Sequence, residues 1–340
     1  MDCMLITFCV VARNEAAAIG RLLDNLCKQT YPHQEIECIF IDGLSDDETK
    51  HIFEAFAQQH DSEFRRILVL DNPGRTLPCG WNVALAHYAG DAIVRVDAHA
   101  EIPEDFIERN VQHISGGDDV CGGHRPNIID EDTPWKRTLL AAETSMFGSS
   151  ISSFRRDGED RCVDSVFHGM YRRQVFDRVG RYNEVLARTE DNDMHYRIRQ
   201  AGYQIRFHPD IVSYEHTRNT LKGMLRQKYL NGFWIGRTLG VTPGCVSLYY
   251  LVPMAFVLGI VLTTVLACLG HPLLGLVMWC AYLALMLLFS VMEWRRGAFH
   301  PDMLLLPVLF FLLHVCYGVG TLLGLVGMPL WRMRISRKEN

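Results

Sequence analysis

Three long charge-free segments near the C-terminus constrain the fold of this 340-residue chain more than any other feature. They cover residues 248–269, 273–292 and 303–327, which are 22, 20 and 25 residues long. A helix needs about 20 apolar residues to cross the roughly 30 Å hydrocarbon layer of a bilayer. Because these segments follow one another with almost no polar sequence between them, they predict transmembrane helices rather than the buried core helices of a soluble protein.

The loops between these segments indicate an orientation. The turn at 270–272 is uncharged, whereas the next loop contains Arg295 and Arg296. Because cytoplasmic loops are enriched in Lys and Arg, this asymmetry predicts a multi-pass protein of the inner (plasma) membrane whose N-terminal body faces the cytoplasm. Three full spans would place the basic tail, 331–340, on the side of the membrane away from the cytoplasm, contrary to the usual enrichment of Lys and Arg on the cytoplasmic side. Two topologies therefore remain open: three spans, or a third segment that breaks at the glycines of 318–327 and re-enters.

The N-terminal part of the chain alternates between two kinds of periodicity. Short apolar runs of strand length alternate with segments of helical spacing. We expect strands at 4–12, 36–43, 65–72 and 91–99, and helices at 16–29, 49–60 and 79–89. Such alternation with short connections predicts an α/β fold, with a mainly parallel sheet covered by helices on both faces. Ligands of these sheets bind at the carboxyl ends of the strands, where Asp42, Asn72 and Asp97 fall.

Residues 217–240 connect this body to the apolar segments. Basic side chains such as Lys222 and Arg237 are interleaved with apolar ones such as Leu225 and Trp234. This pattern favours an amphipathic helix lying among membrane lipids in the headgroup layer, with an ordinary solvated surface helix as the alternative. The predicted organisation is a domain at 1–216, an interfacial helix region at 217–240, a transmembrane region at 241–330 and a basic tail at 331–340.

Charge and composition exclude several classes of protein. The chain has 34 Lys and Arg against 39 Asp and Glu, and only six basic and three acidic residues fall within 241–340. The first 240 residues thus contain 28 basic and 36 acidic residues. This net negative charge argues against nucleic acid as a macromolecular partner. The eleven cysteines include no CxxC pair, which favours reduced cytosolic thiols. The absence of GxGxxG and GxxxxGK[ST] patterns disfavours a nicotinamide-dependent enzyme and a P-loop nucleotidase.

Two acidic residues follow neighbouring predicted strands. Asp42 ends the second strand and Asp97 the fourth. Carboxylates at this edge of a parallel sheet could hold a divalent cation that bridges phosphates, or could bind a base and ribose. An aspartate after a strand also often serves only as a helix cap or turn residue, a role that Ser45 and Asp47 fit.

The order of the motifs distinguishes between these possibilities. The chain contains, in sequence, VVARNE, DGLSDDET, NPGRTLPCGWNVAL, RVDAHAEIP, FHGMYRRQVFDRVGRYNE and TEDNDMHYRIRQAG. Together they resemble the family 2 nucleotide-sugar glycosyltransferases with a GT-A fold, and in particular their membrane-anchored, ExoA-like subgroup of succinoglycan biosynthesis. The resemblance covers residues 4–240 in detail. It implies a GT-A, Rossmann-like domain that binds a nucleotide-sugar donor, followed by transmembrane helices.

The resemblance also implies roles for residues on the donor side. Arg13, Asn14 and Glu15 would border the nucleotide pocket, and Asp42 would contact the base. Asp97 would take the first position of the DxD motif, which faces the ribose and the metal-bound diphosphate.

The second acidic position of that motif is occupied here by His99. Imidazole is a reasonable ligand for Mn²⁺ and a poor one for Mg²⁺, so the expected divalent cation is Mn²⁺ rather than Mg²⁺. Two alternatives remain: Asp97 alone could hold the metal through water, and His99 could be structural.

The TED sequence matches the motif that supplies the catalytic base in the family. Displacement at the anomeric carbon needs a group that accepts the proton of the acceptor hydroxyl, and a carboxylate suits this task. Asp191 is the expected base, with Glu190 beside it; the alternative is that both merely cap a helix. The stretch of Gly169, Tyr171, Arg172 and Arg173 is expected near the acceptor or the diphosphate, and the guanidinium fork of its arginines suits phosphate.

These observations predict an inverting glycosyltransferase that uses a UDP-linked sugar. The predicted acceptor is a polyprenyl-linked glycan, because membrane spans are costly additions for an enzyme with a freely soluble acceptor. Exopolysaccharide or surface-glycan biosynthesis is the implied pathway. The QxxRW motif of processive relatives is absent after Gln227, which favours addition of a single sugar. The alternatives are a polyprenyl-phosphate sugar synthase and a catalytically inactive membrane scaffold; a transporter is disfavoured, because the spans hold no acidic or basic residue apart from His314.

Overall fold

The computed structural model describes residues 4–148, 158–297 and 299–339, which form two compact units. The N-terminal unit comprises Met1–Pro126 and Ser153–His216, and the C-terminal unit comprises Asn127–Ser152 and Thr217–Asn340. Residues 127–152 therefore group with the C-terminal unit, although the sequence pattern assigns them to the first domain.

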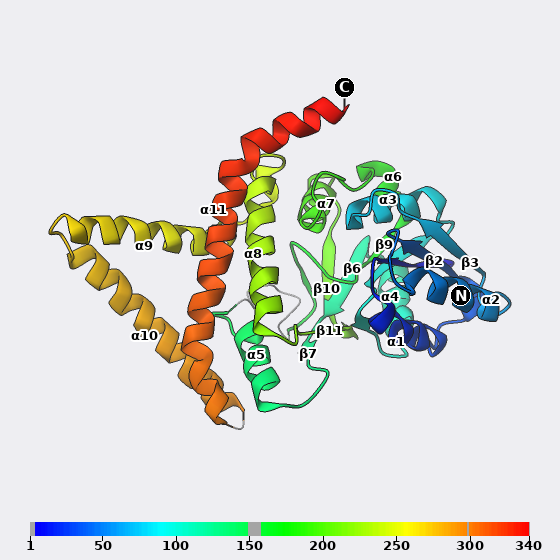
Figure 1. Cartoon of the computed structure of the whole chain (residues 1–340). Helices are drawn as coiled ribbons and strands as arrows, with labels where there is room; N and C mark the ends of the chain where they lie inside the picture. The colour runs from blue at the N-terminus through cyan, green and yellow to red at the C-terminus, as the bar shows by residue number, and fades with distance from the viewer. Residues whose placement is uncertain (1–3, 149–157, 298, 340) are drawn as a thin grey trace. The chain divides into compact units, whose positions relative to one another are not determined.

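An eight-stranded, mainly parallel sheet forms the centre of the N-terminal unit (Figure 1). Its strand order is β3-β2-β1-β4-β9-β6-β10-β8, and β8 and β9 run antiparallel to their neighbours. Its strands are β1 (Ile6–Ala12), β2 (Ile36–Asp42), β3 (Arg66–Asp71), β4 (Ala92–Asp97), β6 (Val120–His124), β8 (Arg161–Cys162), β9 (Met170–Arg172) and β10 (Ile205–Val212). Two short strands, β5 (Ala100–Glu101) and β11 (Tyr214–His216), pair antiparallel beside it.

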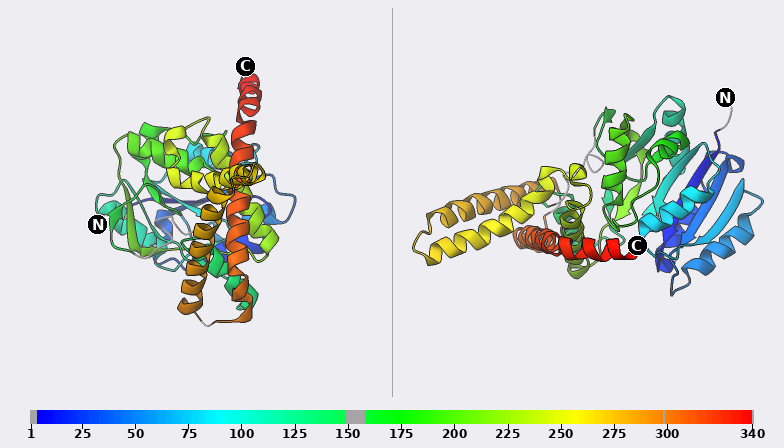
Figure 2. Two further views of the ribbon diagram at one scale, coloured as in Figure 1. Left: turned by 90° about the vertical axis from the view of Figure 1, so that its left-hand side faces the viewer. Right: turned by 90° about the horizontal axis from the view of Figure 1, so that it is seen from above.

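Helices cover both faces of this sheet, as the alternating pattern predicts (Figure 2). They are α1 (Ala16–Cys27), α2 (Thr49–His60), α3 (Leu77–His87), α4 (Phe106–Ser115), α6 (Arg173–Val179) and α7 (Glu190–Gln200), with the short 3₁₀ helix η1 (His33–Glu35). Successive side chains of β1 point to opposite faces. Phe8 and Val10 join the core formed with α1, α2 and α4, whereas Cys9 and Val11 join the core formed with α3, α6 and α7. The α/β fold with a mainly parallel sheet is thus confirmed.

The register of the central strands brings the expected acidic residues to one edge of the sheet. Ala12, the last residue of β1, pairs with Asp42 of β2, and Val11 pairs with Asp97 of β4. Both aspartates are the final residues of their strands, so they lie at the carboxyl edge, on either side of β1. This edge is where open α/β sheets bind their ligands.

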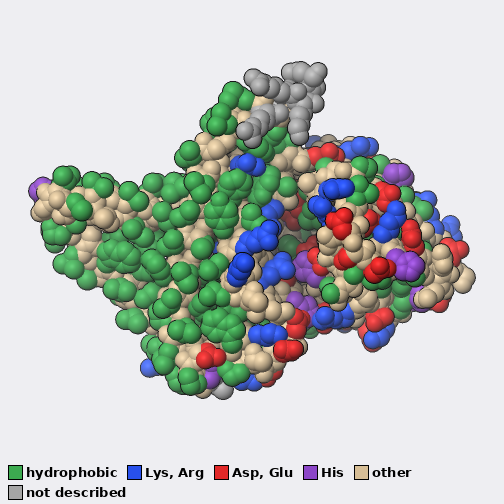
Figure 3. Space-filling model, in the orientation of Figure 1, with side chains coloured by type: hydrophobic (Ala, Val, Ile, Leu, Met, Phe, Trp, Pro, Cys, Tyr) green, Lys and Arg blue, Asp and Glu red, His purple; other side chains and the backbone are tan. Residues whose placement is uncertain are grey.

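In the described residues of the C-terminal unit, the regular elements are helices and one two-residue strand, β7 (Asn127–Ile128). Its helices are α5 (Pro134–Thr144), α8 (Leu221–Thr238), η3 (Pro243–Cys245), η4 (Leu248–Leu251), α9 (Val252–Cys268), α10 (Leu273–Arg296), η5 (Pro301–Leu305) and α11 (Leu306–Glu339). Three stretches are long and apolar enough to cross a membrane: Leu248–Cys268, Leu273–Arg296 and Pro301–Met333, with mean hydropathies of 2.4, 2.2 and 2.1. Hydrophobic side chains dominate the visible surface of α9 and α10 (Figure 3).

Helix α11 is continuous through its glycines, so the broken, re-entrant form of the third segment is not the one observed. The glycines instead allow close helix packing. A Cβ at Gly320 would overlap the carbonyl oxygen of Tyr229, and one at Gly324 would overlap that of Phe233, both in α8. Small residues that let two backbones approach are typical of helix interfaces in membranes.

Helix α8 contacts α11 along one face and α5 through an ion pair. The Nζ of Lys228 lies 2.7 Å from Oε1 of Glu143, and both side chains are buried. The face toward α11 carries Gly232 and Gly236. Whether α8 lies in a headgroup layer stays a prediction, and in the basic tail the side chains at 334 and 336–340 lie outside the described part of the chain.

Candidate active site

A cavity opens in the N-terminal unit beside the carboxyl end of β4. It is lined by Arg95, Asp97, Val166, Phe167, His168, Gly169, Tyr171 and Asp191. Strand β4 supplies Arg95 and Asp97, which point to the same face because they are two residues apart in a strand. Asp191 comes from the first turn of α7, so the cavity brings together the two aspartates to which the sequence assigns metal binding and proton transfer.

The carboxylate of Asp97 lies against a buried histidine. Nε2 of His168 is 3.8 Å from Oδ2 of Asp97. Burial acts to raise the pKa of Asp97, but the interaction with the imidazole of His168, followed by those with His99 and Arg125, outweighs it, and the pKa lies below its ordinary value. Asp97 is therefore ionised at neutral pH. Burial lowers the pKa of His168 despite its interaction with Asp97, so the imidazole is neutral there.

A left-handed backbone conformation places this histidine. His168 has a φ of 46°, which is uncommon outside glycine. Its Nδ1 lies 2.8 Å from the hydroxyl of Ser213, whereas the buried Nε2, facing Asp97, has no hydrogen-bond partner. The hydroxyl contact fixes the orientation of the ring and directs its second nitrogen toward the cavity.

An arginine fixes the expected base. Nη1 of Arg95 lies 2.6 Å from Oδ1 of Asp191 and 2.5 Å from the hydroxyl of Tyr182. The guanidinium stacks over Trp81 at 4.3 Å from the ring centroid and over Tyr182 at 4.8 Å. Its desolvation is offset first by the charge of Asp191, and the pKa of Arg95 remains above its ordinary value. The ion pair holds one oxygen of Asp191 at the cavity wall.

The neighbouring carboxyl has a different environment. Glu190 is buried, and its Oε2 has no hydrogen-bond partner. Burial, followed by the negative charge of Asp191, raises the pKa of Glu190 well above its ordinary value. The two neighbouring carboxyl groups therefore differ: Asp191 lines the cavity and is paired with Arg95, whereas Glu190 is buried and favours its neutral form.

The loop after β1 lies beside the loop after β2. Asn14, which has a φ of 57°, donates its backbone N–H to Oγ of Ser45 at 3.0 Å, and its Oδ1 accepts the N–H of Asp46 at 2.8 Å. Arg13 is exposed at the start of this loop. The side chain of Asp42 is buried: Oδ2 accepts the N–H of Ser45 at 3.1 Å, and Oδ1 has no hydrogen-bond partner among the described residues. An unpartnered buried acceptor suits an N–H donor of a bound base.

His99 lies beyond the end of β4, next to the first loop. Its Nδ1 is 3.4 Å from Oε1 of Glu15. It is not among the residues that line the cavity, although it is only two residues from Asp97. An aspartate and a nearby imidazole form a donor set that suits Mn²⁺, so the chemistry of the residues fits the expected cation.

The structure does not bring all the expected phosphate-binding residues to this cavity. Gly169 lines it, but Arg172 pairs in register with Ala92, at the opposite end of β4 from Asp97. Five residues of strand separate those ends by about 16 Å. Arg172 donates to carbonyl oxygens of Ile114 and Asp118, and Arg173 to those of Tyr88 and Gly90. Because β9 runs antiparallel to β4, it carries both arginines away from the site.

Four lining residues carry no role in the sequence-based prediction: Arg95, Val166, Phe167 and His168. Arg95 could have been noticed as a charged residue inside an otherwise apolar strand, and His168 within the FHGMYRR motif. Tyr171, which the sequence places with Gly169 near the acceptor or the diphosphate, also lines the cavity. Its hydroxyl lies 2.7 Å from Nε2 of His195, and Nδ1 of His195 lies 2.9 Å from the hydroxyl of Ser165. Burial lowers the pKa of His195 to about 4, so this network below the cavity is neutral.

Comparison with known sequences places the N-terminal unit within one family. The family model described as glycosyl transferase family 2 matches residues 7–180. The succinoglycan biosynthesis protein ExoA of Rhizobium meliloti is 31% identical over 196 residues, which are 56% of this chain and 57% of that protein. The chain thus spans just over half the length of ExoA. A Methanococcus voltae enzyme, dolichyl N-acetyl-alpha-D-glucosaminyl phosphate 3-beta-D-2,3-diacetamido-2,3-dideoxy-beta-D-glucuronosyltransferase, is 24% identical over 92% of this chain and 94% of its own length.

Solved structures show the same fold. The mannosyltransferase PcManGT from Pyrobaculum calidifontis, in complex with GDP-Man and Mn²⁺, matches with a TM-score of 0.62 and 17% identity over 94% of this chain and 87% of its own. S. aureus TarS 1-349 in complex with UDP matches with a TM-score of 0.50 and 18% identity over 74% of this chain and 78% of its own. At these identities the likeness concerns the fold alone.

Proposed function

This chain belongs to glycosyl transferase family 2 and is a glycosyltransferase, and on that premise we propose that it transfers a sugar from a UDP-linked donor to a lipid-linked saccharide with inversion at the anomeric carbon. One observation carries the proposal. Asp97 and Asp191 line the same cavity, and the unpartnered oxygen of Asp42 lies at the same edge of the sheet.

The donor would lie across the carboxyl ends of β1, β2 and β4. Oδ1 of Asp42 is buried without a partner and would accept an N–H of the base. The loop of Arg13, Asn14 and Glu15 would form the wall of the nucleotide pocket. Solved relatives of the same fold contain GDP-Man and UDP, which supports a nucleotide-sugar donor.

Asp97 and His99 would hold the divalent cation, Mn²⁺ in preference to Mg²⁺. The support is an ionised carboxylate at the cavity wall with an imidazole two residues away, and a solved relative that contains Mn²⁺. When bound, such a cation neutralises negative charge on the departing diphosphate. Gly169 is the part of the expected diphosphate or acceptor site that lies at the cavity, whereas Arg172 and Arg173 are committed to main-chain carbonyls.

Asp191 would act as the general base. As the acceptor oxygen bonds to the anomeric carbon, its hydroxyl proton moves to a carboxylate oxygen of Asp191, and the diphosphate leaves with the electron pair of the broken C–O bond. Arg95 is the positioning residue, because it holds one oxygen of Asp191 and leaves the carboxylate at the cavity wall. Glu190, with its raised pKa, would remain protonated beside the base.

The C-terminal helices support a membrane-bound acceptor. Three stretches can cross a membrane, and the Methanococcus relative is named for transfer to a dolichyl-linked sugar phosphate. We therefore propose a polyprenyl-linked glycan as acceptor, in exopolysaccharide or surface-glycan biosynthesis, and a multi-pass inner-membrane protein with its catalytic unit in the cytoplasm. The likeness to ExoA supports the pathway.

Calorimetry on the detergent-purified full chain tests the donor site. UDP, GDP and dTDP are titrated in the presence of Mn²⁺, Mg²⁺ or EDTA. We expect binding of UDP that requires metal, is strongest with Mn²⁺ and is lost in Asp97→Ala. Asp71→Asn is the control, because Asp71 also ends a parallel strand of the sheet, β3, and is exposed. Absence of metal-dependent nucleotide binding in the wild type would overturn the donor-site assignment.

Product analysis tests the reaction. With a radiolabelled donor and polyprenyl-linked acceptors, we expect a glycosidic product that disappears in Asp191→Asn while nucleotide affinity is retained. A phosphodiester product would identify a polyprenyl-phosphate sugar synthase instead. Transfer that persists in Asp191→Asn would refute its role as base.

A further inference from the structure

We propose that His113, Asp118 and His208 form a second metal site, one that binds a dication of the Zn²⁺ type. Each residue offers one ligand atom, and these atoms all lie within 4.8 Å of one another. Two imidazoles and a carboxylate form a ligand set that Zn²⁺ uses in proteins. The proposal does not depend on the glycosyltransferase reaction, because none of the three residues lines the catalytic cavity.

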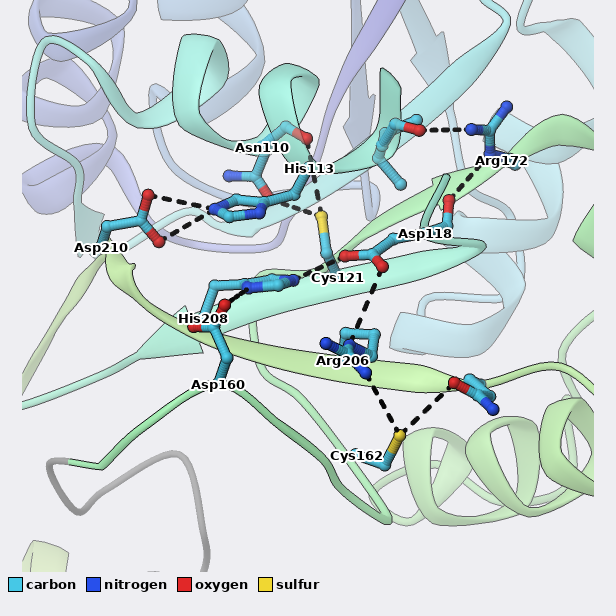
Figure 4. A network of polar contacts seen from close by, with 12 residues as sticks. Asn110, His113, Asp118, Cys121, Asp160, Cys162, Arg172, Arg206, His208 and Asp210 are labelled. Atoms are coloured by element: carbon cyan, nitrogen blue, oxygen red, sulfur yellow. Dashed lines mark hydrogen bonds and ion pairs between the residues drawn. The ribbon is translucent and has the colours of Figure 1, made fainter. Parts of the chain in front are cut away.

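The three residues come from different elements of the N-terminal unit. His113 lies in the last turn of α4, Asp118 in the turn that leads into β6, and His208 in the middle of β10 (Figure 4). The cluster is distant from Asp97, because β10 lies three strands from β4 in the sheet. At about 4.8 Å per strand this amounts to roughly 14 Å.

The two histidines already stack on each other beside the carboxylate. Their ring centroids are 3.5 Å apart with an interplanar angle of 12°, and Nε2 of His208 lies 2.5 Å from Oδ2 of Asp118. Zn²⁺ binds imidazole nitrogen at about 2.0–2.1 Å, which sets tetrahedral ligand atoms roughly 3.3–3.5 Å apart. The most distant ligand atoms therefore need to approach by about 1.5 Å, which rotation of the partly exposed His113 ring can supply. Nε2 of His208 and Oδ2 of Asp118 need to separate by about 1 Å to make room for the ion.

Outer carboxylates complete the pattern expected of a metal site. Nε2 of His113 lies 2.9 Å from Oδ1 of Asp210, and Nδ1 of His208 lies 3.1 Å from Oδ2 of Asp160 (Figure 4). Histidines that bind metals almost always direct their second ring nitrogen to a carboxylate, a carbonyl or water, which fixes the ring and its tautomer. Each histidine of this cluster has a carboxylate near its second nitrogen, with hydrogen-bond geometry at His113 and at ion-pair distance only at His208.

The charge balance favours a dication. Three carboxylates surround the two rings: Asp118, Asp160 and Asp210. The guanidinium of Arg206 lies 3.9 Å from Asp118 and offsets one of these charges. Arg109 interacts with Asp210, so the three carboxylates still exceed the two nearby arginines, and a net negative charge remains at the cluster. A bound dication would offset this charge and would join α4 to β10 through its ligands.

Metal analysis of the full chain, purified in detergent without a polyhistidine tag, tests this site. After Zn²⁺ loading and dialysis, we expect about one bound Zn²⁺ per chain, measured by elemental mass spectrometry. We expect at least a tenfold loss of Zn²⁺ affinity in His113→Gln and in His208→Gln. His51→Gln is the matched control, because His51 is an exposed helical histidine. Asp97→Ala should also retain the ion, which separates this site from the proposed donor site.

Two outcomes would overturn the proposal. One is the absence of Zn²⁺ binding by the wild type, and the other is binding that survives both histidine substitutions. Because His208 is buried, the His208→Gln variant could fail to fold. The second test therefore uses His113→Gln and compares its Co²⁺ absorption spectrum with that of the wild type. Co²⁺ in place of Zn²⁺ should give visible d–d bands typical of four-coordinate nitrogen and oxygen ligation, and these should be lost in His113→Gln. Co²⁺ bands that are unchanged in this variant would count against the site.

Discussion

Replacing Arg95 with methionine tests the ion pair that holds the proposed base. Methionine keeps an unbranched apolar side chain against Trp81 but removes the guanidinium. Oδ1 of Asp191 then loses its partner at 2.6 Å, and the buried hydroxyl of Tyr182 loses its partner at 2.5 Å. The variant protein therefore has two polar groups, the carboxylate of Asp191 and the hydroxyl of Tyr182, that lack the guanidinium partner of the wild type.

The magnitude follows from how deeply these groups are buried. Removing one partner of a fully buried pair costs about 3–5 kcal/mol. The side chain of Asp191 is 24% exposed, so water can solvate it, and we expect about 2 kcal/mol from the pair. The unpaired hydroxyl of Tyr182 adds about 1 kcal/mol. A total near 3 kcal/mol corresponds to a fall in Tm of about 6–12 °C for a unit of this size.

A double-mutant cycle with Asp191→Asn gives the decisive assay. Thermal unfolding is followed by tryptophan fluorescence, for which Trp81 beneath the guanidinium is a local reporter. We expect Asp191→Asn to cost at least about 1.5 kcal/mol less in the Arg95→Met background than in the wild type. Additive effects, within about 0.5 kcal/mol, would refute the coupling. Lys50→Met, which breaks an exposed pair with Asp71, is the control and should cost less than about 1 kcal/mol.

Three further predictions concern other parts of the chain. Glu190→Gln should flatten the pH dependence of Tm. The raised pKa of Glu190 makes the wild type lose stability as pH rises from about 4.5 to about 8, and glutamine cannot titrate. Parallel curves of Tm against pH for the wild type and the variant would contradict this. Gly324→Ala should destabilise the C-terminal unit by about 1–3 kcal/mol through overlap with Phe233, whereas Gly327→Ala, with open space, should not; equal melting temperatures would contradict this. Asp42→Ala should weaken UDP binding at least tenfold by calorimetry, and unchanged affinity would remove Asp42 from the pocket.

The parts of the fold that depend on local periodicity could be predicted from the sequence. The apolar run before Arg13 forms β1, and the runs ending at Asp42 and Asp97 form β2 and β4. Because parallel strands end at one edge, the order of strands and helices is enough to place the two aspartates together. The apolar C-terminal segments are also recognisable, since membrane-spanning helices require only length and hydropathy.

Contacts between distant parts of the chain could not be predicted in this way. Arg95 and Asp191 are 96 residues apart, and their pairing depends on where α7 packs against β4. Arg172 is three residues from Gly169, yet the direction of β9 places the two at different ends of the sheet. The glycines around Gly324 permit a break or a close helix contact equally well, and only the position of α8 distinguishes the two.

Two aspartates in one cavity can have different functions because their neighbours differ. Asp191 is paired with the guanidinium of Arg95, so its charge is already balanced within the protein. The imidazole that faces Asp97, that of His168, has a pKa lowered by burial, so it balances the charge of Asp97 less completely than Arg95 balances that of Asp191, although Arg125 also acts on Asp97. A dication should therefore bind at Asp97, and loss of this carboxylate should remove metal-dependent nucleotide binding. Loss of the Asp191 carboxylate should leave that binding intact and abolish proton transfer, so both variants should lose sugar transfer but only the Asp97 variant should lose metal-dependent nucleotide binding.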